Sequence, residues 1–309
     1  MTTATHHDSS WRWKVIIAFT AVYIIWGSTY LAIRVGVQQL PPALFAGARF
    51  VTAGILLALY ARLSGQKFPT HLREWRTIAI TALFMLVGAN GLVVWGEQWV
   101  PSNQAALIVA TTALWLAGFG TLGAHGQKLG PRTVLGLAVG FFGAAMLLLP
   151  ENGFTLDHLW AQFAVLAACP LWAAGSMVAK RGHLTTPPLM VAALQSLVAG
   201  IVFCGFGFST GEAVRWSWSP QAMAALVYLI IFGSCFAYAA YIWLLHEVSP
   251  AALGTYAYIN PLVAVVLGWL VLRETLSATQ MAGTVVILIG VMLVSITRPR
   301  ALAAPSQRT

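Results

Sequence analysis

The chain has 309 residues, of which 59% are hydrophobic and only 8% are charged, with a formal net charge of +9. A chain of this composition would expose too much apolar surface in water, which excludes a soluble globular protein and predicts an integral membrane protein. The basic residues lie in short connectors between apolar runs and not in one patch, so nucleic-acid binding is not expected.

Ten apolar runs follow one another along the chain, each close to the roughly 20 residues that cross a hydrocarbon core as a helix. They cover residues 14–36, 41–62, 75–97, 103–123, 131–149, 159–180, 187–209, 219–244, 250–272 and 279–297. The connectors are rich in Gly, Pro, Asn and charged residues, as turns are. The sequence therefore predicts an all-α membrane protein with ten transmembrane helices and polar tails at 1–13 and 298–309.

Lysine and arginine are distributed unevenly between the two sides of the membrane. If the N-terminus lies inside, thirteen of the seventeen basic residues fall in inner connectors and tails. Only Arg34, Arg215 and Arg273 fall outside, and Arg49 lies within a predicted helix. Because cytoplasmic connectors carry an excess of Lys and Arg, both termini are expected in the cytoplasm.

An internal repeat divides the chain into residues 14–150 and 151–297. A shift of 146 residues brings identical residues into register: Trp26 with Trp172, Pro41-Pro42 with Pro187-Pro188, and Ala53-Gly54-Ile55 with Ala199-Gly200-Ile201. Each unit holds five predicted helices, and an odd number reverses its orientation in the membrane. Inverted repeats are typical of transporters that work by alternating access and hold substrate near the midplane.

Several motifs in this register resemble a known family. They are Trp26-Gly27-Ser28-Thr29-Tyr30 in the first span, Tyr258-Ile259-Asn260-Pro261-Leu262 in the ninth, and Leu272-Arg273-Glu274 after it. In these motifs the chain resembles the drug/metabolite transporter superfamily, in particular its EamA-type permeases, and among them the bacterial aromatic amino-acid exporters. The resemblance implies a bacterial inner-membrane protein that exports aromatic and other neutral amino acids through an aromatic-lined cavity. The chain differs from the small multidrug transporters of the superfamily, because its first span lacks the glutamate that they carry there.

Aromatic and polar residues at equivalent places of the two repeats are the candidates for such a cavity. Trp26 is equivalent to Trp172, Trp95 is equivalent to Tyr241, and Tyr238 shares a helix face with Tyr241. The further polar candidates for substrate binding are Asn90, Thr112, Ser176, Tyr256 and Asn260. Helix packing is the alternative role for each of these residues, because polar side chains often join membrane helices.

Three other residues lie inside predicted helices, and each has two possible roles. Arg49 lies about 12 Å from the outer end of its helix, at 1.5 Å per residue, and either pairs with a substrate carboxylate or binds neighbouring backbone carbonyls. Pro170 and Pro261 interrupt the sixth and ninth spans, where each either bends the helix for gating or kinks it without a function.

The remaining chemistry argues against an enzyme and against a bound cofactor or metal. All seven histidines lie in tails or connectors, the three cysteines have no metal-ligand spacing, and no acidic residue is placed in the middle of a span. With no evident proton relay, passive transport driven by the substrate gradient is expected. The expected partners are a small-molecule substrate and lipid, and oligomerisation is not required. A channel-like facilitator and, less favoured, an integral-membrane enzyme remain the alternatives.

Overall fold

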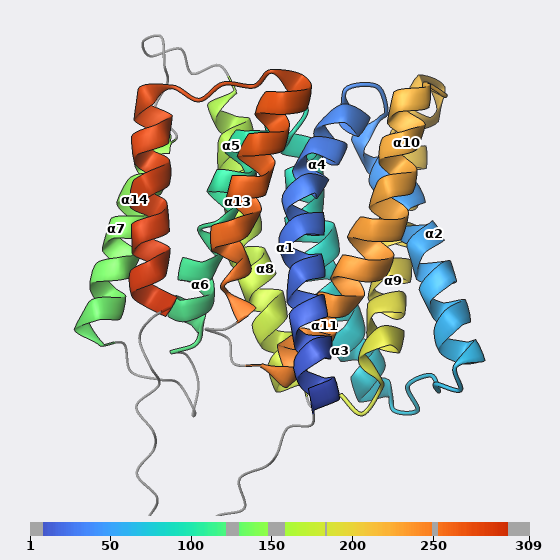
Figure 1. Ribbon diagram of the computed structural model, residues 1–309. Coiled ribbons are helices and arrows are strands. Elements are labelled where there is room, and N and C mark those ends of the chain that lie inside the picture. The colour runs from blue at the N-terminus through green and yellow to red at the C-terminus, as the bar shows by residue number, and fades with distance from the viewer. Residues whose placement is uncertain (1–8, 122–129, 148–157, 183, 249–252, 296–309) are drawn as a thin grey trace, which may run out of the picture.

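The computed structural model describes residues 9–121, 130–147, 158–182, 184–248 and 253–295. In these ranges the protein is entirely helical, without a strand (Figure 1). The first half holds α1 (Ser9–Val37), α2 (Pro42–Leu63), α3 (Leu72–Ala82), η1 (Leu83–Asn90), α4 (Gly91–Gly96), α5 (Ser102–Val109), α6 (Thr112–Phe119) and α7 (Pro131–Leu147). The second half holds α8 (Leu159–Arg181), α9 (Pro188–Ser209), η2 (Glu212–Arg215), α10 (Pro220–Tyr228), η3 (Leu229–Tyr238), α11 (Ala239–Glu247), α13 (Tyr256–Leu267), η4 (Gly268–Leu272) and α14 (Ala278–Ser295).

The helical membrane fold expected from the composition is confirmed, although not every span is one long helix. Six helices within the described residues are long and apolar enough to cross a membrane: Trp11–Val37, Pro42–Leu63, Leu72–Gly96, Leu159–Arg181, Pro188–Ser209 and Pro220–Glu247. Three shorter apolar helices cover Pro131–Met146, Ile259–Leu272 and Ala278–Leu293. The run predicted at 103–123 is divided into α5 and α6 by a turn at Ala110 and Thr111.

The packing of α2 on α9 shows how the two halves are related. The close contacts run in opposite directions along the two helices, because Gly47 meets Cys204 whereas Gly54 meets Leu197. The contacts are also reciprocal: a methyl group added to Gly54 would lie 2.8 Å from the backbone nitrogen of Leu197, and one added to Gly200 would meet Val51. Since the shift of 146 residues converts each of these pairs into the other, α2 and α9 are related by a two-fold axis across the helices. The fold therefore fits an inverted two-repeat architecture.

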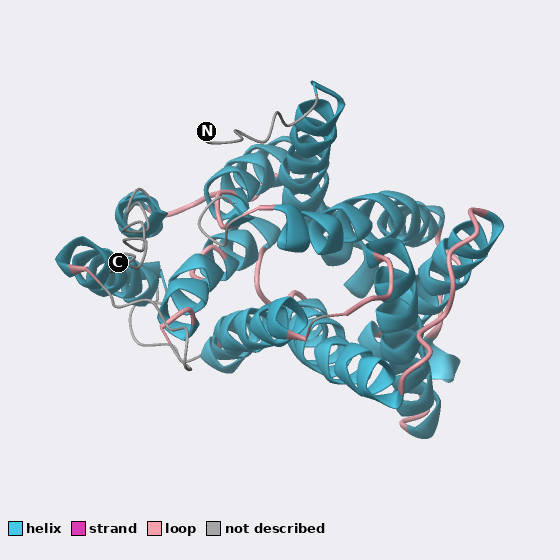
Figure 2. Ribbon diagram, turned by 90° about the horizontal axis from the view of Figure 1, so that it is seen from below, coloured by secondary structure: helices cyan, strands magenta, loops and turns pink. Residues whose placement is uncertain are grey.

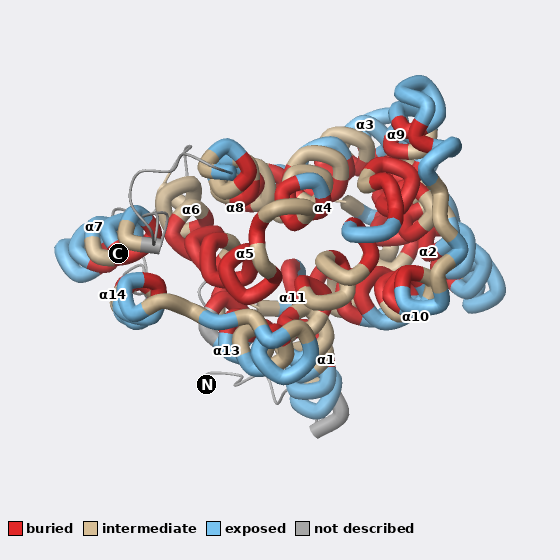
Figure 3. The backbone as a smooth tube through the Cα atoms, turned by 90° about the horizontal axis from the view of Figure 1, so that it is seen from above, coloured by how far each residue is buried: buried red, intermediate tan, exposed pale blue. Residues whose placement is uncertain are grey.

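The last helices of the two halves, α7 and α14, form a second reciprocal pair. A methyl group on Gly143 would lie 2.6 Å from the backbone nitrogen of Ile287, and one on Gly290 would meet the backbone of Gly140. Glycine is required at both positions because the two backbones approach closely. A methyl group on Gly290 would also lie 2.7 Å from the carbonyl oxygen of Gly136, so both glycines of the Gly136-x-x-x-Gly140 spacing lie in this contact. The pair stands to one side of the other helices (Figures 1 and 3).

The remaining helices surround the centre of the bundle, and their buried faces point inward (Figure 3). Helices also enclose this central region when the bundle is seen from the opposite direction (Figure 2), and the labels of Figure 3 show that both halves contribute to it. The lower end of the bundle is defined as the end at which α1 begins at Ser9, and the upper end as the end at which α1 finishes at Val37, as in Figure 1.

Two π-helical segments occupy equivalent positions in the halves. Segment η1 begins at Leu83 and segment η3 begins at Leu229, again 146 residues later. A π-helical turn inserts an extra residue and redirects the side chains that follow it, and such turns are frequent at functional sites. Both segments reach the centre of the bundle, where Asn90 closes η1 and Tyr238 closes η3.

Candidate functional site

A cavity lies at the centre of the bundle and is lined by both halves of the chain. Its walls are formed by Trp26, Thr29, Tyr30, Ile33, Arg49, Phe50, Leu86, Ala89, Asn90, Val93, Val109, Thr112, Ala168, Trp172, Gly233, Tyr238 and Tyr256. About 80 Å³ of its space admits the centre of a water molecule. This is room for several waters, so an aromatic solute would enter only if the surrounding rings moved apart.

The lower side of the cavity is covered by four aromatic rings. The equivalent residues Trp26 and Trp172 meet edge to face with ring centroids 5.4 Å apart. Tyr241 lies 4.9 Å from Trp26, and Tyr256 completes the group at 5.7 Å from Trp26. Edge-to-face and tilted contacts of this kind are favourable beyond the area they bury. The two halves thus meet at their equivalent tryptophans, and the rings separate the cavity from the lower end.

Hydrogen bonds fix the orientation of the rings in this cluster. Trp172 donates from Nε1 to the hydroxyl of Tyr241 at 3.1 Å, and Ser176 shares a hydrogen bond with the same hydroxyl at 2.9 Å. Tyr238 donates its hydroxyl to Gln195 Oε1 at 2.6 Å. These bonds satisfy the polar ends of the aromatic residues, so their apolar faces are presented to the cavity.

Among the described residues that line the cavity, Arg49 is the one that carries a charge. The side chain is only 4% exposed, its Nε donates to Ser234 Oγ at 2.9 Å, and its guanidinium lies over the Phe50 ring at 4.7 Å from the centroid. Its Nη1 has no hydrogen-bond partner among the residues that the structure describes. A buried guanidinium with an unused donor is costly unless an anion or water satisfies it. The structure therefore leaves an anion-binding donor at the cavity wall.

Two uncharged acceptors also line the cavity and lack a partner. The side-chain oxygens of Asn90 (Oδ1) and Thr112 (Oγ1) make no hydrogen bond within the described ranges. Asn90 ends segment η1, and Thr112 follows the turn that divides α5 from α6. An oxygen acceptor in this position is suited to an ammonium group or another N–H donor. Irregular helical backbone thus places both acceptors in the cavity.

The structure brings most of the sequence-predicted residues together. Seven of them line the cavity: Trp26, Arg49, Asn90, Thr112, Trp172, Tyr238 and Tyr256. Tyr241 and Ser176 lie directly behind that wall, since both are fully buried and hydrogen-bonded to each other. Asn260 is also behind it: in the orientation that satisfies its neighbours, its amide donates to the carbonyls of Tyr23 at 3.0 Å and Tyr256 at 3.2 Å. A role in substrate binding remains a prediction for all ten.

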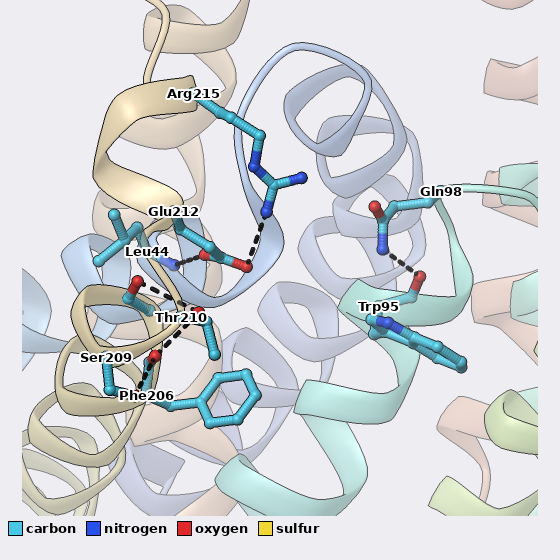
Figure 4. A network of polar contacts seen from close by, with 9 residues as sticks. Leu44, Trp95, Gln98, Phe206, Ser209, Thr210, Glu212 and Arg215 are labelled. Carbon is cyan, nitrogen blue, oxygen red and sulfur yellow. Dashed lines mark hydrogen bonds and ion pairs between the residues drawn. The ribbon is translucent and has the colours of Figure 1, made fainter.

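Trp95 is the exception, and its expected position must be corrected. It does not line the cavity but is 39% exposed and packs on Trp160 and Trp99, with ring centroids 4.8 and 5.4 Å away. Figure 4 shows its ring directed away from the helices that carry Leu44 and Glu212, while its carbonyl accepts from Gln98. Amphipathic indole rings favour the membrane interface, which explains this cluster at the upper end. Its equivalent, Tyr241, is fully buried, so the repeat symmetry is broken here.

Helices α8 and α13 continue through the two prolines predicted to interrupt them. Pro170 lies inside α8 (Leu159–Arg181), and Pro261 lies inside α13 (Tyr256–Leu267). Each removes one backbone donor without ending its helix. A gating role for either residue stays a prediction.

Sequence reasoning missed several residues that belong to the cavity or its surroundings. Thr29, Tyr30 and Phe50 line the cavity, and Glu97 lies one helical turn above the lining residue Val93. Thr29 and Tyr30 stand on the α1 face of Trp26, three and four residues after it, so helical spacing could have indicated them. The full burial of Glu97 had no comparable signal, because the residue follows an apolar run directly.

Three carboxylates join the halves at the two ends of the bundle. At the lower end, Glu74 accepts from the backbone nitrogen and hydroxyl of Thr185, both at 2.6 Å. At the upper end, Glu212 accepts from the backbone nitrogen of Leu44 at 2.8 Å (Figure 4), and Glu274 accepts from that of Ser102 at 2.9 Å. Glu212 and Glu274 satisfy backbone donors in the first turns of α2 and α5, and Glu74 binds the segment that leads into α9. Any relative movement of the halves has to break or rotate about these contacts.

No group of three or more His, Cys, Asp or Glu residues that could hold a metal ion is found in the part of the chain that the structure describes.

Comparison with known proteins gives matches along nearly the whole chain. The model of the EamA-like transporter family matches residues 13–149 and again residues 159–296. The uncharacterized inner membrane transporter YedA of Escherichia coli (strain K12) is 39% identical over 281 residues, which cover 90% of each chain. The uncharacterized transporter YoaV of Bacillus subtilis (strain 168) is 24% identical and covers 93% of this chain and 98% of its own.

A further relative and a solved structure extend this similarity. Protein PagO of Salmonella typhimurium (strain LT2) is 25% identical, with 92% of this chain and 94% of its own covered. A chain of known crystal structure superposes with a TM-score of 0.68 at 20% identity, over 91% of this chain and 96% of that chain. At this level of identity the superposition shows a shared fold.

Proposed function

This chain belongs to the EamA-like transporter family, and on that premise we propose that it exports small zwitterionic metabolites, foremost aromatic and other neutral amino acids, by alternating access. Membership of the family makes the chain a membrane transporter. The substrate class and the mechanism are the proposal.

One observation supports the substrate class: an unpaired hydrogen-bond donor, two unpaired acceptors and several aromatic rings line a single central cavity. Arg49 Nη1 offers a donor for a carboxylate, and the oxygens of Asn90 and Thr112 offer acceptors for an ammonium group, with no partner for any of them in the described ranges. Trp26 and Trp172 supply faces and edges for an apolar side chain. A zwitterion with an aromatic side chain would complement all three features. One methylene changes apolar binding by only about 1–3 kcal/mol, so broad specificity is expected.

The broken repeat symmetry supports alternating access. Tyr241 seals the lower side of the cavity beneath Trp26, whereas its equivalent Trp95 lies outside the cavity at the upper end. A cavity that is reached from only one side of the membrane requires the two repeats to adopt different conformations. Exchange of these conformations between the halves would close the upper side and open the lower one.

The proposed topology has ten membrane crossings and both termini in the cytoplasm of a bacterial inner membrane. It places Lys67 on the cytoplasmic side and Thr210 on the outer side, and both side chains are exposed. In a variant without Cys169, Cys204 and Cys235, an impermeant thiol reagent added to intact cells should label Thr210→Cys and leave Lys67→Cys unlabelled until the membrane is opened. The opposite pattern would reverse the orientation.

The proposed function is tested by uptake into proteoliposomes that contain the purified protein. A panel of phenylalanine, tryptophan, threonine, glutamate and glucose should give saturable uptake of the neutral amino acids, with mutual competition between them. Uptake that rises linearly with concentration would indicate the alternative, a channel-like facilitator. No uptake of any amino acid would remove the proposed substrate class.

A further inference from the structure

We infer that Glu97 is a proton-binding site at the upper end of the cavity and that transport is coupled to the proton it carries. The inference rests on the proposed transport function for its coupling, but not for the proton site itself. It departs from the expectation of passive transport, which was based on the absence of acidic residues from the middle of the predicted spans.

Glu97 is a carboxylate in an environment that offers its ionised form no hydrogen bond. The residue follows α4 directly, is 0% exposed, and neither Oε1 nor Oε2 has a partner within the described ranges. In the same part of the chain, no Lys or Arg nitrogen lies within 4.0 Å of its oxygens. Burying an unpaired ionised carboxylate costs much more than burying the neutral acid. A bound proton removes that cost.

The cation next to Glu97 is engaged with its backbone and not with its side chain. Arg34 donates from Nη1 to the carbonyl oxygen of Glu97. In the amide orientation that satisfies its neighbours, the side-chain oxygen of Gln38 accepts from Arg34 Nε at 3.0 Å and from Nη2 at 3.1 Å. The guanidinium is therefore close enough to pair with the carboxylate after a side-chain movement, but it does not do so in this conformation. This gives two alternative states: a protonated Glu97 with Arg34 on the carbonyl, and an ionised Glu97 paired with Arg34.

Several other titratable groups surround Glu97, and different elements carry them. Helix α1 contributes Tyr30 as well as Arg34, and α2 contributes Arg49. The segment after η4 contributes Glu274, whose charge opposes ionisation of Glu97. Segment η1 carries no titratable side chain, and on α8 the buried Cys169 is the titratable group facing Tyr30.

Arg49 links the proton to the substrate site: its positive charge lies on the wall of the cavity whose lining residue Val93 is one helical turn below Glu97, and its free donor faces that cavity. A substrate carboxylate bound to Arg49 would offset that positive charge and thereby favour the protonated Glu97. By thermodynamic linkage, a proton on Glu97 would then strengthen binding of the substrate carboxylate to the same extent, so proton and substrate would cross the membrane together. Export then requires an outward substrate gradient that exceeds the opposing proton gradient. In each cycle the Glu97 carboxylate takes one proton from water on one side of the membrane and returns one proton to water on the other side. No other bond changes.

The proton site can be tested without a substrate, by infrared difference spectra of the purified protein titrated with pH. At neutral pH the wild type should show the carbonyl stretch of a buried, protonated carboxylic acid. Glu97→Gln should lack this band, and Glu247→Gln, which changes an exposed carboxylate at the other end of the bundle, should retain it. If the three spectra agree, Glu97 is ionised at neutral pH and the inference is overturned.

The coupling is tested in proteoliposomes with and without an imposed pH gradient. For one coupled proton, a gradient of one pH unit should change the steady-state accumulation of phenylalanine by up to about tenfold in the wild type and in Glu247→Gln. In Glu97→Gln the gradient should have no effect, while downhill uptake and counterflow continue. A gradient effect that persists in Glu97→Gln contradicts the coupling. Loss of uptake from the wild type itself would instead contradict the proposed function and leave the infrared result standing.

Discussion

Replacing Arg49 by glutamine should weaken binding of carboxylate-bearing substrates by at least about thirtyfold while affecting amines without a carboxylate much less. Removing one partner of a buried, hydrogen-bonded charge pair costs about 2–5 kcal/mol, and the lower value already corresponds to this factor. The measurement is the concentration dependence of phenylalanine uptake compared with that of phenethylamine, or inhibition by each if the amine is not carried. Phenethylamine has the same ring and ammonium group and lacks only the carboxylate.

Two further variants separate the substrate role of Arg49 from a structural one. Ser234→Ala removes the acceptor of Arg49 Nε and should lower thermal stability without changing the preference for carboxylates. Arg215→Gln removes an exposed arginine whose Nη2 lies 3.7 Å from Oε1 of the buried Glu212, outside the cavity, and should leave transport unchanged. Equal losses for phenylalanine and phenethylamine in Arg49→Gln would show that the arginine only supports the helices.

Replacing Trp172 by alanine should reduce transport of phenylalanine more than transport of threonine, by a factor of about two to ten. The ring lines the cavity, and a favourable aromatic contact contributes about 0.5–1.5 kcal/mol beyond the area it buries. The polar ends of both substrates would keep their partners at Arg49, Asn90 and Thr112. The comparison is the ratio of the two initial uptake rates at equal protein levels.

Trp95→Ala is the matched control for Trp172→Ala, because it removes the same side chain from outside the cavity. It should change both rates alike and leave their ratio unaltered. Tyr241→Ala is unsuitable for this comparison, since the residue is fully buried and its truncation would cost about 3–5 kcal/mol of stability, as for other large aromatics. A larger change of the ratio in Trp95→Ala than in Trp172→Ala would contradict the proposed cavity.

The repeat explains why much of the fold could be predicted from the sequence. An almost constant shift between the halves predicts that Trp26 and Trp172 are equivalent, and the structure places their rings in contact. The same shift relates Gly54 to Gly200, which fill equivalent places in the contact between α2 and α9. Symmetry of this kind survives in sequence because each close helix approach needs a small residue on both sides.

Other features depend on three-dimensional context and could not be predicted in the same way. The π-helical segments η1 and η3 have no distinctive composition, although they direct Asn90 and Tyr238 into the cavity. The position of Trp95 was predicted from symmetry, which fails where the two halves adopt different conformations. Glu97 directly follows an apolar run in the sequence, but packing of α4 against neighbouring helices buries it completely.

The central claim is that substrate binds in the cavity between the halves, and protection of introduced cysteines tests it most directly. Asn90→Cys and Thr112→Cys place thiols on the cavity wall, and Thr210→Cys places one on the exposed upper surface, each in a background without the three native cysteines. Saturating phenylalanine should slow modification of the two cavity thiols by a small permeant reagent and leave the rate at Thr210→Cys unchanged. Equal rates with and without phenylalanine at both cavity positions, in variants that still transport it, would contradict the account.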